Sequence, residues 1–574
     1  MPIHNSDVAE RLDEIADLLA IEEADLFRIR AYRNAARTIR SLSREVADMV
    51  ESDEDLTELP DVGESIASKI RELVETGSLE QLVELESEVP VELRDILRVE
   101  GLGPKRTATL HHELGIETLD DLEAAAEAGR VRELDGFGEK TEQSILEHVD
   151  AARRAEERTL LSIAEERAGD FFDLLDGVDE TNRVVIAGSF RRRKETVGDL
   201  DVLVTCDDAE PVMEAFVEFE DVDEVVSRGE TRSTIVTRGD FQVDLRVVPD
   251  ESYGAALHYF TGSKSHNIAC RERAVERGYK LNEYGVFDAD SDERLGGESE
   301  EEVYELLEME YVEPELRENR GELEAAEEGT LPELVEYDEL RGDLHAHTTA
   351  SDGRNTVETM AEAAARRGLE YLAITDHSQA VSVTGGLDAA KLTDHADAIR
   401  SVDETVDGIE LLTGCEVDIL EDGSLDLPDD ALAELDVVIC AIHSGFDLDA
   451  GEQTDRIVSA LENPHTAILG HPSGRMIHER EAYDVHMETV IEAAVDFGVA
   501  LEIDSQPNRL DLDDVHCQRA REAGATFVVS SDAHSTDQLD YLRWGVDQAR
   551  RGWLEADDIL NTRSVEDVTS ALES

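Results

Sequence analysis

The chain has 574 residues, of which 138 are acidic and 53 are basic, so its formal net charge is −85. This charge excludes a conventional basic surface for nucleic-acid binding, and with only seven lysines among the 53 cations the composition indicates adaptation to molar salt, a halophilic type. Apolar residues still make up 40% of the chain. A chain of this length is too long to fold around a single hydrophobic core, so we expect about three to five domains.

No run of about 18 apolar residues occurs, and the N-terminus lacks a basic segment followed by an apolar one. We therefore expect no membrane-spanning helix and no signal peptide, and a cytoplasmic protein. The five cysteines lie far apart without a CxxC pair, which predicts buried free thiols rather than disulfides.

The first 160 residues predict helices, beginning with an amphipathic helix over 6–21. Three short turns, at 59–63, 99–105 and 134–140, each open a new helix. Such a glycine turn presents unpaired backbone N–H groups that hold a phosphate without side-chain charge, which suits an acidic protein. The pattern is that of helix-hairpin-helix motifs, the alternative being ordinary interhelical turns. The glycines concerned are Gly63, Gly101, Gly103, Gly136 and Gly138.

One stretch of this region, residues 27–44, contains six arginines and no acid. At about 1 M salt the Debye length falls to roughly 3 Å, so local surfaces rather than net charge decide binding. The stretch is either a helix face whose guanidinium groups pair with acids elsewhere or a patch that contacts DNA phosphates. The arginines are Arg28, Arg30, Arg33, Arg37, Arg40 and Arg44.

Strand-like segments at 184–190, 201–205 and 241–248 predict an α+β catalytic module. The Gly188-Ser189 turn is followed at once by four cations that suit a triphosphate. Asp199 and Asp201 alternate along one strand and Asp244 lies in another, a set that two Mg²⁺ ions require for nucleotidyl transfer. The alternative is that Asp244 forms a structural pair with Arg246 or Arg191.

The segment AGSFRRRKETVGDLDVLV, with YFTGSKSHN and RGYKLNEYGVF downstream, resembles the family X (DNA polymerase beta-like) DNA polymerases over roughly residues 5–320. The resemblance implies a palm and thumb, two Mg²⁺ or Mn²⁺ ions on the three aspartates, and DNA and dNTPs as partners. It implies that Asn267 lies near the minor-groove edge and Arg271 near the template strand. The residues it implies for the triphosphate and sugar are Gly188, Ser189, Arg192, Gly198, Tyr259, Phe260 and Gly262.

Two positions depart from that family pattern. Gln242 stands where animal members carry an arginine, two residues before the third aspartate. This difference is expected to affect how that aspartate binds its metal ion, and hence the rate of nucleotide addition. Lys69 matches the Schiff-base lysine of the family's lyase centre, but Ser65 occupies the position of its companion lysine.

The residues beyond 340 alternate seven strand-like runs with helical ones, which predicts a β/α barrel. Eleven of the 17 histidines fall here, most of them at strand ends, where a barrel gathers them at one mouth. Mixed imidazole and carboxylate ligands suit Zn²⁺, Mn²⁺ or Fe²⁺. The candidate ligands are His345, His347, Asp352, His377, Glu416, His443, His471, Asp532 and His534.

These motifs, DLHAHT, TDHS, CEVDI, IHSG, GHP and SDAH, resemble the polymerase and histidinol phosphatase (PHP) domain, a trinuclear phosphoesterase. The resemblance implies three metal positions. The first is held by His345, His347, Glu416 and Asp532; the second by Glu416, His443 and His471; and the third by Asp352, His377 and His534.

The expected architecture is multidomain. It has all-α helix-hairpin-helix domains, an α+β nucleotidyltransferase palm with a thumb, and a distorted (β/α)7-like barrel. The expected boundaries are 1–80 (gap-binding, lyase-like), 81–155 (fingers), 156–250 (palm), 251–320 (thumb), 321–339 (acidic linker) and 340–574 (PHP).

The expected function is that of a monomeric repair polymerase, acting in base excision repair, that fills gaps in gapped or nicked duplex DNA. Its PHP domain would act as a 3′–5′ exonuclease or 3′-phosphatase. The alternatives are a phosphoesterase whose polymerase half only binds DNA, and a metabolic phosphatase with no DNA role.

Overall fold

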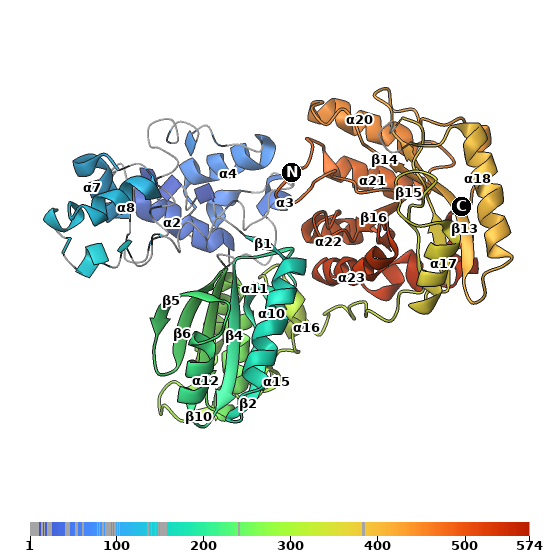
Figure 1. Cartoon of the computed structure of the whole chain (residues 1–574). Helices are drawn as coiled ribbons and strands as arrows, with labels where there is room; N and C mark the ends of the chain where they lie inside the picture. The colour runs from blue at the N-terminus through green and yellow to red at the C-terminus, as the bar shows by residue number, and fades with distance from the viewer. Residues whose placement is uncertain are drawn as a thin grey trace.

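The computed structural model describes residues 158–572, apart from 239–240 and 381–384, together with parts of the first 157 residues. In those first residues the longer described stretches are 26–40, 46–51, 55–59, 62–76, 104–116 and 118–134. Figure 1 shows a helical N-terminal region, a palm built on a twisted sheet, and a C-terminal α/β unit.

The N-terminal region is helical, as the sequence predicts. In α2 the buried side chains Ile29, Tyr32, Ala36 and Ile39 recur at helical spacing and form one packed stripe. Helix α8 begins at a reciprocal capping box between Thr118 and Asp121. The elements are α2 (Leu26–Arg40), α3 (Val46–Glu51), η1 (Leu56–Glu58), α4 (Glu64–Thr76), α7 (Pro104–Leu114), α8 (Leu119–Glu127) and η2 (Val131–Glu133).

The palm is a five-stranded sheet of order β2-β4-β7-β6-β5, in which only β4 and β7 pair in parallel. Its apolar positions alternate with polar ones, so one face packs on α10 and α12. The elements are β1 (Thr159–Leu160), α10 (Leu161–Asp176), β2 (Thr181–Ile186), α11 (Gly188–Arg191), β3 (Thr196–Val197), β4 (Asp199–Cys206), α12 (Ala209–Val217), β5 (Val222–Arg228), β6 (Arg232–Thr237) and β7 (Gln242–Val248).

The thumb combines helices with a small antiparallel sheet of order β10-β9-β8. The predicted linker 321–339 includes a packed helix, because Leu323 and Ala326 of α16 belong to the thumb core and Val335 belongs to the barrel core. The elements are η3 (Asp250–Ser252), α13 (Tyr253–Thr261), α14 (Lys264–Glu276), β8 (Tyr279–Asn282), β9 (Gly285–Asp288), β10 (Arg294–Gly296), α15 (Glu300–Leu306), η4 (Pro314–Leu316) and α16 (Glu322–Glu328).

The C-terminal unit contains the seven predicted strands, all parallel and in sequence order. A bridge between Ala346 and Ala533 joins the ends of the first and last strands, so the barrel is nearly closed. The strands are β11 (Gly342–Asp343), β12 (Tyr371–Ile374), β13 (Glu410–Asp418), β14 (Val437–Ala441), β15 (Ile468–Leu469), β16 (Ala500–Asp504) and β17 (Phe527–Ser530).

Helices between the strands cover this barrel, and in α17 the buried Val357, Met360, Ala361 and Ala364 mark the face that packs on it. The helices are α17 (Val357–Arg366), α18 (Ala389–Asp403), α19 (Asp429–Leu432), α20 (Ala450–Leu461), α21 (Met487–Phe497), α22 (Asp514–Ala523), η5 (Thr536–Tyr541), α23 (Leu542–Arg551), η6 (Ala556–Asp558), η7 (Leu560–Thr562) and α24 (Val565–Leu572).

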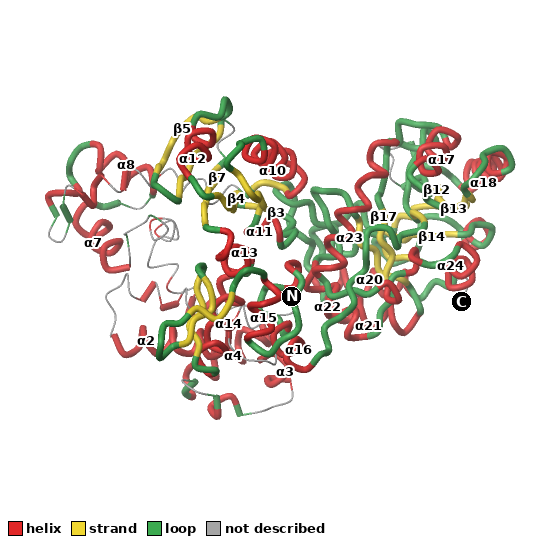
Figure 2. The backbone as a smooth tube through the Cα atoms, turned by 90° about the horizontal axis from the view of Figure 1, so that it is seen from below, coloured by secondary structure: helices red, strands yellow, loops and turns green. Residues whose placement is uncertain are grey.

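The palm and the barrel pack directly on each other. Leu510 and Trp544 of the barrel belong to the same apolar cluster as the palm strands, and Figure 2 shows α23 on the side of the barrel that faces the palm. All five cysteines are buried and free, as predicted. None of the helices in the described part of the chain combines the length and the apolar content that crossing a membrane requires.

Candidate active sites

The three palm aspartates lie on the two parallel strands of the sheet. Asp201 of β4 pairs in register with Asp244 of β7, and Asp199 is two residues away on the same strand. The alternate residues Leu200 and Val202 point into the core beneath α10 and α12, so Asp199 and Asp201 lie on the opposite face of the sheet. The structure therefore brings the three predicted carboxylates together.

The electrostatics of this cluster suit a divalent cation. Burial and the neighbouring carboxylates raise the pKa of Asp199, and the same two causes raise the pKa of Asp201 well above its ordinary value. A bound cation relieves this repulsion, and carboxylate oxygens are the ligands that Mg²⁺ prefers. The residues present therefore fit a metal-dependent centre.

Asp244 does not form the structural pair that the sequence left open. Its oxygens accept hydrogen bonds from Thr234 Oγ1 at 2.5 Å and from Gln242 Nε2 at 2.8 Å. Among the described residues, the arginine within 4 Å of its carboxylate is Arg232, at 3.6 Å, rather than Arg246 or Arg191. Gln242 thus orients the third aspartate through a neutral hydrogen bond.

The Gly188-Ser189 turn lies against these carboxylates. Gly188 has a φ of 63°, and a Cβ built on it would lie 2.3 Å from Asp201 Oδ2, so only glycine fits. Arg192, three residues after Ser189, donates from Nε to Glu318 at 2.9 Å and from Nη1 to the carbonyl of Thr261 at 2.7 Å. The adjoining Arg191 instead pairs with Glu300 of the thumb at 2.6 Å.

The thumb residues that the resemblance implied also meet in one place. Asn267 donates from Nδ2 to the carbonyls of Tyr259, at 2.7 Å, and Gly262, at 3.0 Å, so it fixes the turn after α13. Its Oδ1 has no hydrogen-bond partner. Phe260 packs edge-on against Tyr259, and Arg271 donates to the Asn267 carbonyl at 3.1 Å.

Sequence analysis missed one cation near the aspartates. Arg158 donates from Nε to Thr196 Oγ1 at 2.7 Å, and a Cβ on Gly198 would lie 3.4 Å from its Nη1. Burial lowers the pKa of Arg158, and the opposite charge of Asp199 offsets part of this lowering. It precedes the palm sheet and lies outside the motif, so no local pattern marks it.

In the N-terminal region the structure covers part of the predicted contacts. Gly63 precedes α4, and Gly138 precedes a further helical segment, whereas Gly101, Gly103 and Gly136 lie outside the described residues. Lys69 lies on α4 and is half-buried, with Ser65 exposed one turn earlier.

The arginine stretch forms helix α2. The side chains of Arg28, Arg30 and Arg33 are exposed on that helix, opposite its buried stripe. The side chains of Arg37 and Arg40, and the whole of Arg44, lie outside the described residues.

The nine candidate ligands of the barrel converge at one end of it. Glu416 is central: its Oε1 lies 3.1 Å from His443 Nε2 and 2.9 Å from His471 Nε2. Its Oε2 lies 3.5 Å from both His345 Nε2 and His347 Nε2, and 2.7 Å from His377 Nδ1.

The remaining two acids complete the cluster. Asp532 Oδ1 lies 3.0 Å from His347 Nε2, and Asp352 lies 3.4 Å from His534 Nε2 and 3.6 Å from His377 Nε2. The groups of the barrel whose ligand atoms all lie within 4.8 Å of one another are His345-His347-Asp532, His377-Glu416-His443, and His347-Asp352-His377-His534.

Several of the ligand atoms have no hydrogen-bond partner, although His471 Nε2 and Glu416 Oε1 are hydrogen-bonded at 2.9 Å. Buried atoms without a hydrogen-bond partner include His345 Nε2, His377 Nδ1 and Glu416 Oε2, although they lie so close together. His471 and Asp532 also hold positive φ angles, 29° and 47°, which are uncommon for non-glycine residues. The donor set therefore fits a multinuclear centre.

Residues behind the ligands orient them, and sequence analysis missed these. His345 Nδ1 lies 2.7 Å from Glu502 Oε1, and His443 Nδ1 lies 3.1 Å from Asp418 Oδ1, which leaves the other nitrogen of each ring for a metal. Strand alternation could have found both acids. Asp418 follows Glu416 by two residues on β13, and Glu502 is the middle residue of β16, two residues before Asp504 at its end.

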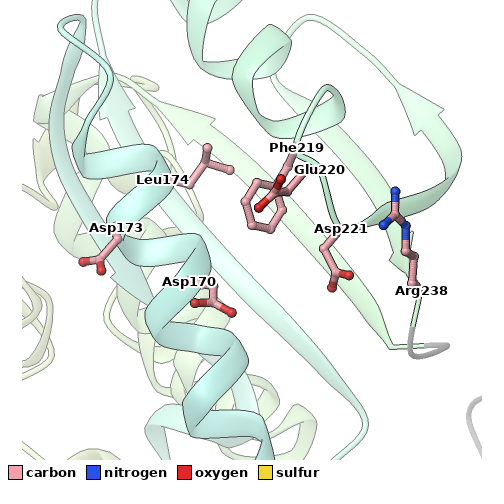
Figure 3. Close-up of a pocket in the computed structure, with 7 residues that line it drawn as sticks. All are labelled: Asp170, Asp173, Leu174, Phe219, Glu220, Asp221 and Arg238. Carbon is pink, nitrogen blue, oxygen red and sulfur yellow. The ribbon is translucent and has the colours of Figure 1, made fainter.

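A further pocket lies in the palm, away from both clusters. Figure 3 shows it between α10, the segment that follows α12 and the end of β6. It lies on the helix-covered side of the sheet, whereas the aspartates lie on the other side. Its lining residues are Asp170, Asp173, Leu174, Phe219, Glu220, Asp221 and Arg238.

Five family models match the chain in the order of these units. They are a helix-hairpin-helix domain (residues 3–79), a SAM-like helix-hairpin-helix tandem (93–150), the DNA polymerase beta palm (167–244), the DNA polymerase beta thumb (256–318) and the PHP domain (343–506).

Relatives match the whole chain or part of it. A protein of Bacillus subtilis (strain 168) described as "DNA polymerase/3′-5′ exonuclease PolX" is 36% identical over 572 residues, 99% of each chain. A "probable phosphatase" of Thermoanaerobacter sp. (strain X514) is 29% identical over 231 residues, 38% of this chain and 89% of that protein. Because the first match spans both chains from end to end, this protein belongs to the family X DNA polymerases that carry a C-terminal PHP domain.

Proposed function

We propose that this protein is a gap-filling DNA polymerase whose PHP barrel trims DNA 3′ ends as a 3′–5′ exonuclease. The observation that carries the first activity is the register of Asp201 with Asp244 beside the Gly188 turn. The observation that carries the second is the intact cluster around Glu416. The full-length similarity to a polymerase with exonuclease activity supports the combination.

In the palm, Asp199, Asp201 and Asp244 would hold two Mg²⁺ or Mn²⁺ ions. When bound, these ions activate the primer 3′-hydroxyl and stabilise the charge of the departing pyrophosphate. Arg192 and the backbone of the Gly188-Ser189 turn would bind the triphosphate, and the turn fixed by Asn267 would bind the sugar. The protein's own contribution is therefore positioning and charge complementarity.

In the barrel, the nine ligands would hold up to three ions of Zn²⁺, Mn²⁺ or Fe²⁺, which supply a nucleophile near neutral pH and stabilise negative charge on a phosphate. Glu502 and Asp418 hold His345 and His443 in the orientation that metal binding needs. Fusion to the polymerase raises the local concentration of primer ends at this mouth.

Contacts to the DNA outside the catalytic centres would come from helix-hairpin-helix turns and from the exposed arginines of α2. Backbone N–H groups at such turns bind phosphates without net side-chain charge, which is how a chain of charge −85 can hold DNA at high salt. We therefore propose gapped or nicked duplex, as in base excision repair, as the substrate of a halophilic enzyme.

A lyase role for Lys69 is a separate proposal. A neutral lysine amine could attack the aldehyde of an abasic 5′-phosphate end. Ser65 in place of a second lysine predicts that this activity is slow or absent. Borohydride trapping measures it, and an equal adduct yield from Lys69→Ala would remove Lys69 from the role.

The test of the main proposal is incubation of a labelled gapped duplex with dNTPs and Mg²⁺ or Mn²⁺ in molar KCl. We expect extension to the end of the gap by wild type. Extension that is absent under every condition, together with 3′-end hydrolysis, would favour the alternative in which the polymerase half only binds DNA. A primer that stays uncut with every metal, while a small phosphate monoester is hydrolysed, would instead favour a metabolic phosphatase.

A further inference from the structure

The turn that follows α11, residues 192–195, is contacted by the PHP barrel. Arg551 Nη1 donates to the carbonyl of Arg192 at 2.6 Å. Arg193 lies 3.6 Å from Asp547, and Glu195 pairs with Arg475 at 2.7 Å. Three of the four residues that follow α11 are therefore contacted by side chains of the PHP barrel. The least separated of these pairs, Glu195 and Arg475, is 280 positions apart in the sequence.

Arg551 is the centre of this contact. Its side chain is only 2% exposed, and it pairs with Asp514 at 2.5 Å and with Glu318 at 3.4 Å. Arg320 shares Asp514 at 3.0 Å. Charge-assisted hydrogen bonds that are shielded from water in this way are stronger than exposed ones.

Glu318 links Arg551 to the side chain of Arg192. Its Oε1 lies 2.9 Å from Arg192 Nε and 3.4 Å from the Arg551 guanidinium. Burial opposes its ionisation, but Arg192 and Arg551 hold the pKa of Glu318 at about 2, so the carboxylate is charged at neutral pH. Arg192 is thus fixed at its backbone by Arg551 and at its guanidinium by Glu318 and the Thr261 carbonyl.

We propose that Arg551 of the PHP domain is a positioning residue of the polymerase site, which holds Arg192 where the incoming triphosphate binds. The polymerase site is then complete only when the barrel is docked on the palm. This inference rests on the proposed role of Arg192 in nucleotide binding. The physical reason is preorganisation: a cation held in place before the nucleotide arrives loses less freedom on binding.

The test compares steady-state extension by wild type and Arg551→Gln on one gapped duplex. Loss of a buried charge-assisted contact predicts a KM for dNTP raised about tenfold, with kcat changed about threefold at most. Exonuclease activity on the same primer is expected to stay at the wild-type level, because Arg551 lies on the palm side of α23. The matched control is Arg367→Gln, since Arg367 is a barrel arginine that makes a forked pair with Asp540, at 2.6 and 2.8 Å, within the barrel itself.

Two further variants keep the result interpretable. Arg551→Lys keeps the charge but loses the forked geometry and should give an intermediate KM. Asp514→Asn removes an anchor of Arg551 and should raise the KM in the same direction.

Three outcomes would overturn the proposal. One is an unchanged KM for Arg551→Gln although Arg192→Ala raises it. Another is an equal fall of both activities and of Tm in Arg551→Gln and Asp514→Asn, which would reduce Arg551 to a structural contact. The third is an unchanged KM for dNTP in Arg192→Ala, which would show that Arg192 does not bind the nucleotide and would remove this inference. The polymerase assignment would still stand in that case, provided that the wild-type protein extends the primer.

Discussion

At the scale of single residues, the barrel centre depends most on Glu416. Its two oxygens face five imidazoles within 3.5 Å, and it is buried at the centre of the cluster. Asp352 lies at the edge of the cluster and is exposed, and the imidazoles within 4 Å of its carboxylate in the described part of the chain are those of His347, His377 and His534. A residue shared between metal positions should matter more than one that serves a single position.

The expected result is that Glu416→Ala lowers 3′-end hydrolysis by about a hundredfold or more, and that Asp352→Ala costs less. Release of labelled nucleotide from a 3′-labelled primer measures both, with added Mn²⁺ or Zn²⁺ after chelation. Primer extension by the same preparations is the control, and it should be unaffected because the palm has its own carboxylates. Equal losses in the two variants would contradict the central position of Glu416.

Glu300 provides a residue-scale test by pH. Burial opposes its ionisation, but Arg317 and Arg191 hold its pKa at about 2, below the ordinary value of a glutamate. A carboxyl whose folded pKa is depressed contributes stability that is full above its unfolded pKa and is lost as the pH falls through the folded one. Glu300 therefore stabilises the palm–thumb contact at neutral pH.

Glu300→Gln should accordingly lower the free energy of unfolding at pH 7 by a few kcal/mol, because Arg317 and Arg191 lose a buried partner. The difference from wild type should shrink as the pH falls from about 4 toward 2. Denaturant melts across this range, in molar KCl, measure it. A difference that stays constant with pH would show that the ionised carboxylate is not what stabilises the contact.

At the scale of elements, α2 presents a cationic face in an acidic protein, with Arg28 and Arg30 exposed. If these side chains contact phosphates, each contact releases a counterion, so the affinity for DNA falls with salt. The double variant Arg28→Gln, Arg30→Gln should bind gapped duplex more weakly. The slope of log K against log [KCl] should become shallower by about two.

Fluorescence anisotropy over a range of KCl concentrations measures that slope. The control is Arg366→Gln on α17, a 65% exposed arginine of the barrel that pairs with Glu362. An unchanged slope for the α2 variant would show that these arginines interact within the protein rather than with DNA phosphates.

Local pattern predicted the elements well. The palm strands are predicted by alternation of apolar and polar residues, because one face of that sheet is buried. The barrel strands are predicted by short, continuously apolar runs, because a parallel strand covered on both sides buries both faces. The metal cluster was predicted for a related reason, since ligands at successive strand ends of a barrel meet at one mouth.

Contacts between distant elements were not predictable in this way. Arg551 and Arg192 are 359 positions apart, and nothing in the local sequence of either indicates the other. The linker 321–339 was predicted from its glutamates, but Glu322 is buried against His266 at 2.6 Å, a pairing that only the fold reveals. Composition indicates where a chain is polar but does not indicate which polar groups find buried partners.

At the scale of the whole molecule, a charge of −85 on one chain should make folding depend on salt. At about 0.1 M the Debye length is about 10 Å, so the acids repel one another across the surface. Dilution from molar KCl to about 0.1 M should therefore unfold or inactivate the protein. Circular dichroism and primer extension measure this, with sucrose of matched osmolality as a control that does not screen charge. Unchanged signals in dilute buffer would contradict it.

The most direct test of the central claim, two separate metal-dependent centres on one chain, is a single gel assay on a gapped duplex with a labelled primer. Wild type, Asp199→Asn and Glu416→Ala are compared in molar KCl, with and without dNTPs. The account predicts that Asp199→Asn loses extension but still shortens the primer, and that Glu416→Ala extends but no longer shortens it. Normal extension by Asp199→Asn, or loss of both activities in either folded variant, would contradict it.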